Sequence, residues 1–129
     1  MIKNKGIHYI YDFTDIKIND VKEYFNDIND ILNIVIKECN LNQIGESNNF
    51  FDGENTPPGF ANVRVLDESH ISAHSYSDIG ILAVDIFTCG NLDNGNKAGK
   101  LLKKLILKKF NAIIKNEYVL KRFPYKMND

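Results

Sequence analysis

Three side chains of the types that do covalent chemistry, Ser69, His74 and Cys89, lie within 21 residues, and Glu68 precedes the serine. A serine hydroxyl or a cysteine thiol acts as a nucleophile, and a histidine or a carboxylate takes or gives the proton. The segment from residue 66 to residue 90 is therefore the part of the chain in which we look for chemistry first.

A serine or cysteine hydrolase is one interpretation of these residues. Ser69 or Cys89 would supply the nucleophile and His74 the base. The sequence contains no G-x-S-x-G pattern, which places a nucleophilic serine on a sharp turn. A chain of 129 residues also leaves little room for an oxyanion hole and a cleft. From residue types alone, structural roles are the simpler interpretation.

A metal site is the second interpretation, because His70 and His74 are four residues apart, with Asp67 and Asp78 nearby. On a strand, these histidines would share a face but lie about 13 Å apart, too far to meet easily on one ion. The zinc patterns H-x-E and H-E-x-x-H are absent. We therefore expect no metal.

The composition indicates a single globular domain, with 43% hydrophobic and 26% charged residues. The sequence has no long uncharged apolar run and no signal-peptide pattern, so we expect no membrane partner. Cys39 and Cys89 make no disulfide framework. They would stay reduced in the cytoplasm, which is the location we expect.

The charge is unevenly distributed along the chain. Residues 1–96 carry 6 basic and 15 acidic side chains, whereas residues 97–126 carry 10 basic and one acidic. A basic segment can bind nucleic acid, but such segments usually bring arginines and aromatic rings. This one has a single arginine, Arg122. We interpret it as a solvated helix face and expect no nucleic-acid partner.

The pattern of apolar residues predicts which elements position the reactive side chains. A helix is predicted after an N-cap at Asp20, in a capping box with Glu23, and runs to about Cys39. Its apolar face comprises Val21, Phe25, Ile28, Leu32, Val35 and Cys39. A second helix is predicted over Lys97–Ile114, facing inward with Leu101, Leu102, Leu105, Phe110, Ile113 and Ile114.

Strands are predicted over Ile7–Phe13, Ala61–Leu66, Ile71–Tyr76, Gly80–Thr88 and Glu117–Arg122. Residues 42–59 are rich in Asn, Gly and Pro and predict a loop, and residues 91–96 predict a turn. The order favours an α+β fold, a two-layer sandwich of an antiparallel sheet with helices on one face. A second copy would cover the other face and complete an α-β-β-α homodimer.

The segment from Pro57 to Gly90 reads PPGFANVRVLDESHISAHSYSDIGILAVDIFTCG. Its Glu-Ser-His-x-x-x-His and Asp-x-Phe-Thr-Cys-Gly patterns resemble, without a gap, the active-site segment of the prokaryotic-type S-adenosylmethionine decarboxylase proenzymes. Upstream, Gly6-Ile7-His8 and Asp12-Phe13 are similar to the opening strand of that family. The resemblance covers most of the chain, with length changes around residues 14–58.

This resemblance implies that the chain cleaves itself between Glu68 and Ser69. The products would be residues 1–68, the β chain, and residues 69–129, the α chain. Ser69 Oγ would attack the carbonyl of Glu68 and turn the amide into an ester, and His74 matches the histidine that helps the ester eliminate. Ser69 would then become a pyruvoyl cofactor at the start of the α chain.

The resemblance also implies the reaction. The pyruvoyl group derived from Ser69 would form a Schiff base with the substrate amine and accept the electrons released by decarboxylation. Cys89 matches the proton donor that returns a proton to the α-carbon, a role suited to a thiol. The implied substrate is S-adenosylmethionine, whose decarboxylated product serves spermidine and polyamine biosynthesis.

The match is looser where the family binds adenosine. Tyr76 and Asp78 stand in place of residues for the adenine ring and the ribose hydroxyls, and Phe51 is a candidate for a second ring beside the base. Glu68 is also a candidate for substrate contact. A serine that assists processing in the family is replaced by Ala61, with Asn62 beside it as a candidate substitute donor.

Two alternatives stay open at this point. The same chemistry could act on arginine or ornithine in a looser pocket. A non-catalytic homologue that binds or regulates a partner decarboxylase is the other alternative. The presence of Ser69, His74 and Cys89 together argues against it.

Overall fold

The computed structural model describes residues 2–126. In chain order, the elements are β1 (Ile2–Thr14), α1 (Val21–Glu38), β2 (Gln43–Phe51), β3 (Gly59–Leu66), β4 (Ser69–Tyr76), β5 (Ile81–Cys89), α2 (Leu92–Phe110) and β6 (Ile113–Lys126). All six strands belong to one sheet.

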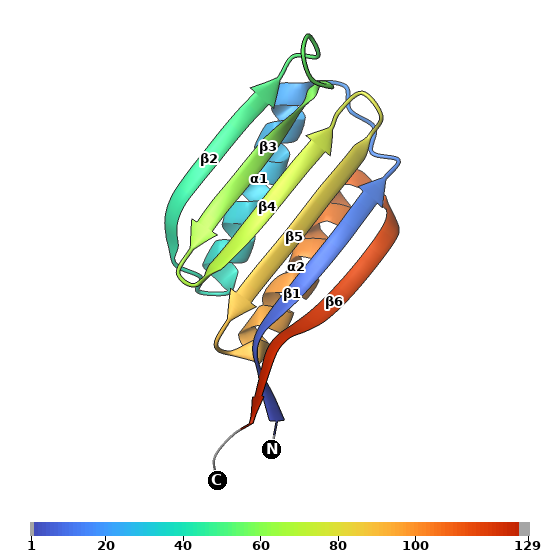
Figure 1. The fold of residues 1–129 in the computed structure, drawn as a ribbon. Helices are drawn as coiled ribbons and strands as arrows, with labels where there is room; N and C mark the ends of the chain where they lie inside the picture. The colour runs from blue at the N-terminus through green and yellow to red at the C-terminus, as the bar shows by residue number, and fades with distance from the viewer. Residues whose placement is uncertain (1, 127–129) are drawn as a thin grey trace.

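The strands lie in the order β2-β3-β4-β5-β1-β6, and each neighbouring pair is antiparallel. Both helices lie on the same side of the sheet, behind it in Figure 1. The predicted α+β fold with helices on one face is therefore confirmed. We call the side of the sheet without helices the open face.

The side chains of β5 show how the two faces differ. Leu82, Val84, Ile86 and Thr88 are buried beneath the helices, and the residues between them, Ala83, Asp85, Phe87 and Cys89, are half-buried on the open face. This alternation follows from the two-residue period of a strand. The sequence of β5 is nearly all apolar, so the one charged side chain on its open face, Asp85, is unusual.

Helix α1 begins where the sequence predicts. The Asp20 carboxylate accepts hydrogen bonds from the backbone N–H groups of Lys22 and Glu23, at 2.9 and 3.2 Å, and so caps the helix. Most of the predicted apolar face is buried, and Cys39 is a fully buried core residue.

The prediction for Val21 was wrong, because this side chain is 39% exposed. The buried stripe of α1 begins instead at Tyr24. The Tyr24 ring packs edge-on against Phe60 of β3 and Phe110 of α2, with centroids 5.3 and 5.2 Å apart. This contact anchors the second turn of the helix and leaves Val21 outside the core.

Helix α2 begins and ends earlier than predicted. Residues 91–96 are not a turn: the Asn91 side chain accepts a 3.1 Å hydrogen bond from the Asn94 backbone N–H, and the helix starts at Leu92. At the other end, Asn111 adopts φ of +50° and stops the helix. Ile113 and Ile114 therefore belong to β6 and not to the inward face of α2.

Close packing explains why a Gly/Asn-rich segment becomes helical. A Cβ atom added at Gly95, within this segment, would lie 2.7 Å from Cγ2 of Ile7, and one added at Gly99 would lie 2.3 Å from Cδ2 of Tyr9, so only glycine lets α2 approach β1 this closely. The Tyr11 hydroxyl donates a 2.9 Å hydrogen bond to the Gly99 carbonyl. Tertiary contact with the sheet thus outweighs the weak helix propensity of this segment.

The predicted loop over residues 42–59 was also wrong. Gln43–Phe51 forms β2, an edge strand that pairs with β3 along its whole length, and only the residues after it are irregular. Nearly all of its side chains are exposed, so the sequence shows neither alternation nor an apolar run. Pairing with β3, which the local sequence does not encode, makes this segment a strand.

Within residues 2–126, no helix combines the length and the apolar character needed to cross a membrane.

Candidate active site

Ser69 is the first residue of β4, directly after a tight turn. Leu66 and Ser69 lie opposite each other in the sheet, so Asp67 and Glu68 alone form the connection. Glu68 has φ of +57°, a left-handed conformation that residues with a Cβ atom adopt rarely. The peptide bond between Glu68 and Ser69 therefore follows a strained residue.

Ser69 and Cys89 meet where β4 begins and β5 ends. The backbone N–H of Cys89 donates a 3.4 Å hydrogen bond to Ser69 Oγ. Cys89 is half-buried, is not in a disulfide and belongs to the open-face side of β5. The structure thus brings together two of the three predicted catalytic residues.

His74 lies away from this pair. It is exposed on the open face, between Ala61 of β3 and Ala83 of β5 in the register. Ser69 and His74 are five residues apart on one strand, so their side chains point to opposite faces and about 16 Å of strand separates them. Within one chain, the structure does not bring His74 to Ser69.

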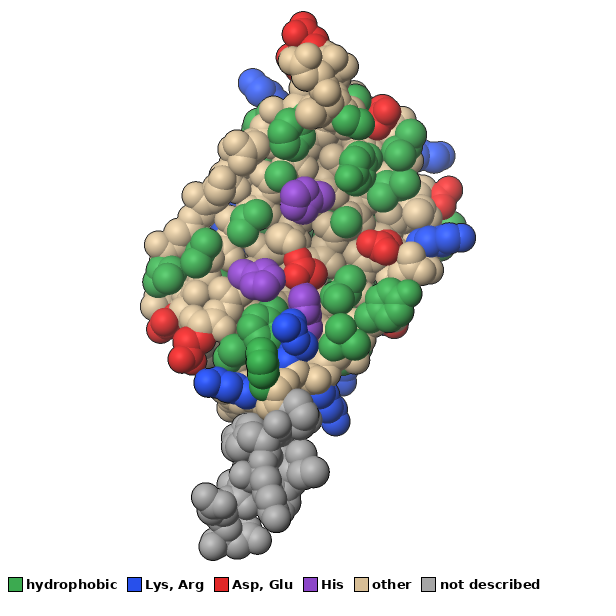
Figure 2. Space-filling model, in the orientation of Figure 1, with side chains coloured by type: hydrophobic (Ala, Val, Ile, Leu, Met, Phe, Trp, Pro, Cys, Tyr) green, Lys and Arg blue, Asp and Glu red, His purple; other side chains and the backbone are tan. Residues whose placement is uncertain are grey.

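A shallow hollow of about 250 Å³ lies beside His74 on the open face. Figure 2 shows the histidines on this face, with hydrophobic side chains spread around them. The polar residues that line the hollow are His8, Asp12, Ser72, His74 and Asp85.

Three of the four predicted substrate-binding residues, Phe51, Tyr76 and Asp78, lie at the end of the sheet far from Ser69. Phe51, Gly59 and Tyr76 are in one register row, so the two exposed rings flank a glycine. Asp78 is exposed in the turn between β4 and β5. Tyr76 is seven residues from Ser69, about 23 Å along β4. Only Glu68 of the predicted substrate-binding residues is next to Ser69 in the same chain.

Asn62 cannot replace the family serine at position 61. Ala61 is opposite His74 in the register, on the open face. Asn62 is fully buried on the helix side, where its Nδ2 donates a 3.1 Å hydrogen bond to Asn29 Oδ1 and its Oδ1 accepts one from Arg64. The strand alternation therefore removes Asn62 from the site, and that interpretation was wrong.

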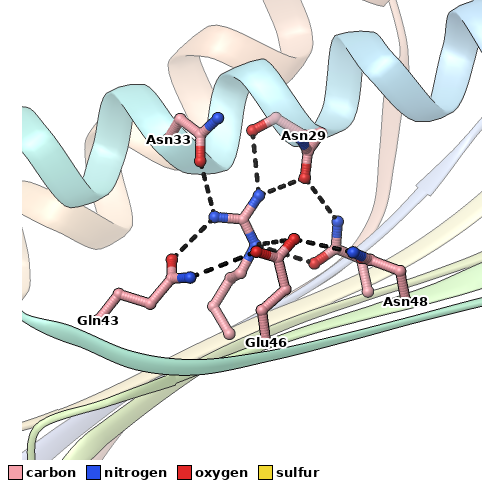
Figure 3. Close-up of polar contacts among 7 residues, drawn as sticks. Asn29, Asn33, Gln43, Glu46 and Asn48 are labelled. Carbon is pink, nitrogen blue, oxygen red and sulfur yellow. Dashed lines mark hydrogen bonds and ion pairs between the residues drawn. The ribbon is translucent and has the colours of Figure 1, made fainter.

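Arg64 is the centre of a polar network that the sequence interpretation missed (Figure 3). Its guanidinium is buried between α1 and the sheet and donates to Asn33 at 2.7 Å and Gln43 at 2.9 Å, and also to Asn29. Glu46 lies 3.5 Å from Arg64 Nε. Because Gln43 and Glu46 belong to β2, the network ties the edge strand to the helix layer.

Asp85 is the centre of a second network, which lies on the open face. Its Oδ2 atom is 2.6 Å from His8 Nε2 and 3.0 Å from His70 Nε2, and its Oδ1 accepts a hydrogen bond from Ser72. The sequence interpretation did not single out Asp85. A lone carboxylate within the apolar run from Gly80 to Thr88 was the signal that could have indicated it.

The direction of the hydrogen bonds follows from Arg122. Its Nη1 is 3.2 Å from His8 Nδ1, and a guanidinium can only donate. His8 Nδ1 therefore carries no proton, and Nε2 donates its proton to Asp85. His70 Nε2 likewise donates to the Asp85 carboxylate.

The same three residues have the composition of a metal site, since the ligand atoms of His8, His70 and Asp85 lie within 4.8 Å of one another. A metal ion requires a ring nitrogen without a proton. His8 Nδ1 accepts a hydrogen bond from Arg122, so the ring proton of His8 is on Nε2, the atom that faces Asp85. The hydrogen-bond pattern therefore favours a proton-linked network over a metal centre.

Electrostatics agree with an ionised carboxylate in this network. Burial by itself raises the pKa of Asp85, but hydrogen bonds from Ser72, His8 and His70 outweigh burial and hold the pKa below its usual value. Asp85 thus remains a charged acceptor at neutral pH.

The fold agrees with that of a known protein. The crystal structure of the adenosylmethionine decarboxylase from Aquifex aeolicus VF5 superposes with a TM-score of 0.75 at 24% identity and covers 98% of both chains. The class defined by fold and site is therefore a two-layer α+β sandwich with a Ser69–Cys89 pair at the ends of its central strands.

The sequence comparisons are more specific. The family model for S-adenosylmethionine decarboxylase matches residues 7–114. The S-adenosylmethionine decarboxylase proenzyme of Persephonella marina is 28% identical over 106 residues, 82% of this chain and 76% of that one. The proenzyme of Archaeoglobus fulgidus is 32% identical over 95 residues, 74% of this chain and 78% of the relative. The chain belongs to the S-adenosylmethionine decarboxylase family.

Proposed function

We propose that this chain is a self-processing, pyruvoyl-dependent decarboxylase that converts S-adenosylmethionine to decarboxylated S-adenosylmethionine and carbon dioxide. The observation that carries the proposal is the hydrogen bond from the Cys89 backbone to Ser69 Oγ, directly after the strained residue Glu68. Membership of the family supports the choice of substrate. The reduced thiol of Cys89 suits a cytoplasmic enzyme.

Cleavage would begin with attack of Ser69 Oγ on the carbonyl carbon of Glu68. The C–N bond breaks, an ester forms, and the Ser69 nitrogen becomes a free amine. Removal of the Ser69 α-proton then breaks the Cβ–Oγ bond and leaves Glu68 with a carboxylate. Hydrolysis then replaces the nitrogen of residue 69 with a ketone oxygen and releases ammonia. The left-handed Glu68 stores roughly 1–3 kcal/mol that cleavage would release.

The sheet would hold the two fragments together after cleavage. Residues 1–68 contain β1, β2 and β3, and residues 69–129 contain β4, β5 and β6. In the sheet these strands interleave, because β1 lies between β5 and β6 and β3 pairs with β4. The fragments therefore share one hydrogen-bonded sheet and one core.

The residues at the β3–β4 turn fit a pyruvoyl group made from Ser69, because Ser69 starts the second fragment and the Cys89 backbone donor already faces its side chain. When present, that group supplies a ketone for the substrate amine and an adjacent amide carbonyl as electron sink. Cys89 holds at Sγ the proton that the substrate α-carbon needs once carbon dioxide has left.

A homodimer would complete the site. Ser69 and Cys89 lie at one end of the sheet, with Cys89 on the open-face side, and His74, Tyr76 and Asp78 lie toward the other end. If two open faces stack about a twofold axis that runs across the strands, one end of each sheet meets the opposite end of its partner. Each of the two sites would then combine Ser69 and Cys89 of one chain with His74 of the other.

The open face has the composition of such an interface. Large hydrophobic side chains that belong to the open-face rows of the sheet are between 38% and 53% exposed: Phe51, Val65, Tyr76, Tyr118 and Leu120. They surround the charged network of Asp85. Exposed apolar area of this kind is typical of a surface that is covered in the assembled protein.

The row that contains Phe51, Gly59 and Tyr76 suits an adenine ring. The two aromatic residues are separated by two strand spacings, about 10 Å, and the glycine between them presents no side chain. A planar base needs about 7 Å between two stacked rings, so the gap can admit one. The Asp78 carboxylate in the adjoining turn would accept hydrogen bonds from ribose hydroxyls.

Two measurements test the function. Intact mass should show that the 14.8 kDa chain splits between Glu68 and Ser69. Carbon dioxide release from S-adenosylmethionine, arginine and ornithine should then be measured in parallel on the processed protein, and we expect release from S-adenosylmethionine alone. A chain that stays whole after long incubation refutes self-processing, and release from arginine or ornithine alone refutes the substrate.

A further inference from the structure

We propose that Asp85 is a positioning residue for this reaction: it fixes His70, and through His70 the residue-69 end of the second fragment. The inference rests on the proposed function and adds to it a residue with a defined task. Asp85 is not bonded to Ser69 or to the predicted proton donor, so its effect has to pass through His70.

His70 links Asp85 to the residue at which the chain would be cleaved. His70 follows Ser69 directly, so any group made from Ser69 stays attached to the His70 backbone nitrogen. The His70 Nε2–H donates a 3.0 Å hydrogen bond to Asp85 Oδ2. The imidazole is 42% exposed and also lies against the rings of His8 and Phe87, with centroids 5.9 and 5.8 Å apart. The ring contacts set no hydrogen-bond direction, so Asp85 is the group that fixes which way Nε2 of the ring points.

Asp85 is itself held rigidly, which a restraint requires. Ser72 donates to its Oδ1, and His8 donates to its Oδ2 at 2.6 Å. His8 in turn accepts from Arg122, whose guanidinium lies 5.1 Å from the centroid of the Phe87 ring. The network therefore crosses β6, β1, β5 and β4, four adjacent strands of the sheet.

The restraint on His70 becomes important once the chain is cleaved before residue 69. In the whole chain, Ser69 is held on both sides, by the β3–β4 turn and by β4. After cleavage, residue 69 is a chain end, and chain ends fray unless something ties them down. A reacting group has to stay within about 0.5 Å of its productive position. A charged hydrogen bond on the very next residue would keep the new end beside Cys89.

The test is Asp85→Asn, assayed with S-adenosylmethionine as kcat per cleaved chain, with cleavage measured by intact mass. We expect cleavage to proceed, KM to change less than about threefold, and kcat to fall roughly 10- to 100-fold, the range for loss of a charge-assisted hydrogen bond. Asp27→Asn removes a carboxylate on α1, 3.9 Å from Lys109, and is the control with wild-type kcat.

A double-mutant cycle shows whether Asp85 acts through His70. If it does, Asp85→Asn in a His70→Ala background lowers kcat no further than His70→Ala alone. Independent, multiplicative losses overturn the inference, as does an unchanged kcat in Asp85→Asn. If Asp85→Asn does not fold, two variants of His70 replace it in the test. His70→Gln keeps a hydrogen-bond donor and should retain a higher kcat than His70→Ala. Equal losses of kcat in the two variants overturn the inference. Failure of the wild-type chain to cleave would refute the proposed function instead.

Discussion

Ser69 and His74 lie on the same strand, five residues apart, yet their side chains point to opposite faces of the sheet. The sequence places both in one short motif, and the motif alone suggests that they act on each other directly. The structure instead leaves about 16 Å between them. In the proposed homodimer, His74 would instead act at Ser69 of the other copy of the chain.

Complementation between two inactive variants tests the shared site. Co-expressed Ser69→Ala and His74→Ala chains form hybrid dimers in which one site has Ser69 of one chain and His74 of the other intact. We expect partial cleavage of the His74→Ala chain, seen by intact mass, while each variant alone stays whole. If each site were built from a single chain, both sites in the hybrid would lack one residue and neither chain would be cleaved.

The Cys89→Ala variant should separate maturation from turnover. The hydrogen bond to Ser69 Oγ comes from the Cys89 backbone, so alanine retains it. We expect cleavage close to wild type on a denaturing gel. Carbon dioxide release should fall by roughly 100-fold or more, because the proposed proton donor is missing. Parallel losses of cleavage and turnover would contradict the role of Cys89.

Phe50 and Phe51 are neighbours on β2 that should respond differently to alanine. Phe51 belongs to the open-face row of Tyr76, so Phe51→Ala should raise KM for S-adenosylmethionine roughly 5- to 100-fold, the range for loss of one stacked ring. Phe50 packs against Phe25 with centroids 4.6 Å apart. Phe50→Ala should lower the denaturation midpoint and leave KM near wild type. If Phe50→Ala raised KM and Phe51→Ala lowered the denaturation midpoint instead, the ring beside the adenine base would be Phe50 and not Phe51.

Removal of the buried guanidinium should destabilise the fold. Arg64→Leu leaves the amide oxygens of Asn29, Asn33 and Gln43 without their donor. We expect a loss of about 3–5 kcal/mol in the free energy of unfolding, measured with urea. As control, Asn48→Ala removes only an exposed contact to Glu46 and should lose less than about 1 kcal/mol. A similar small loss for both variants would show that the network contributes little.

Stability should depend on pH through Asp85. Its pKa is lower in the folded state than in the unfolded chain, because its hydrogen bonds outweigh burial. The contribution of ionised Asp85 to the free energy of unfolding is therefore full above the pKa of the unfolded chain, about 3.9, and is lost as pH falls through the pKa of the folded state. The difference in urea midpoint between wild type and Asp85→Asn should narrow below about pH 4. A difference that stays constant from pH 7 to pH 3 would contradict this assignment.

The sequence predicted well where local chemistry is strong. The cap at Asp20 and the apolar face of α1 located the first helix, and the long apolar run located β5. The prediction failed where tertiary contact decides. Gln43–Phe51 is a polar segment that becomes a strand only by pairing with β3, and residues 92–96 are helical where Gly95 lets α2 pack closely on Ile7 of β1.

By itself, the sequence determined the family and the two-layer fold and indicated the candidate reactive residues, because these depend on residue types, spacing and periodicity along the chain. Only the tertiary structure decided which of these residues meet. It joined Ser69 to Cys89, separated both from His74, and brought His8 and His70 to Asp85 across three strands. The physical reason is strand register, which sets both the face and the neighbour of every side chain and is not readable from one segment alone.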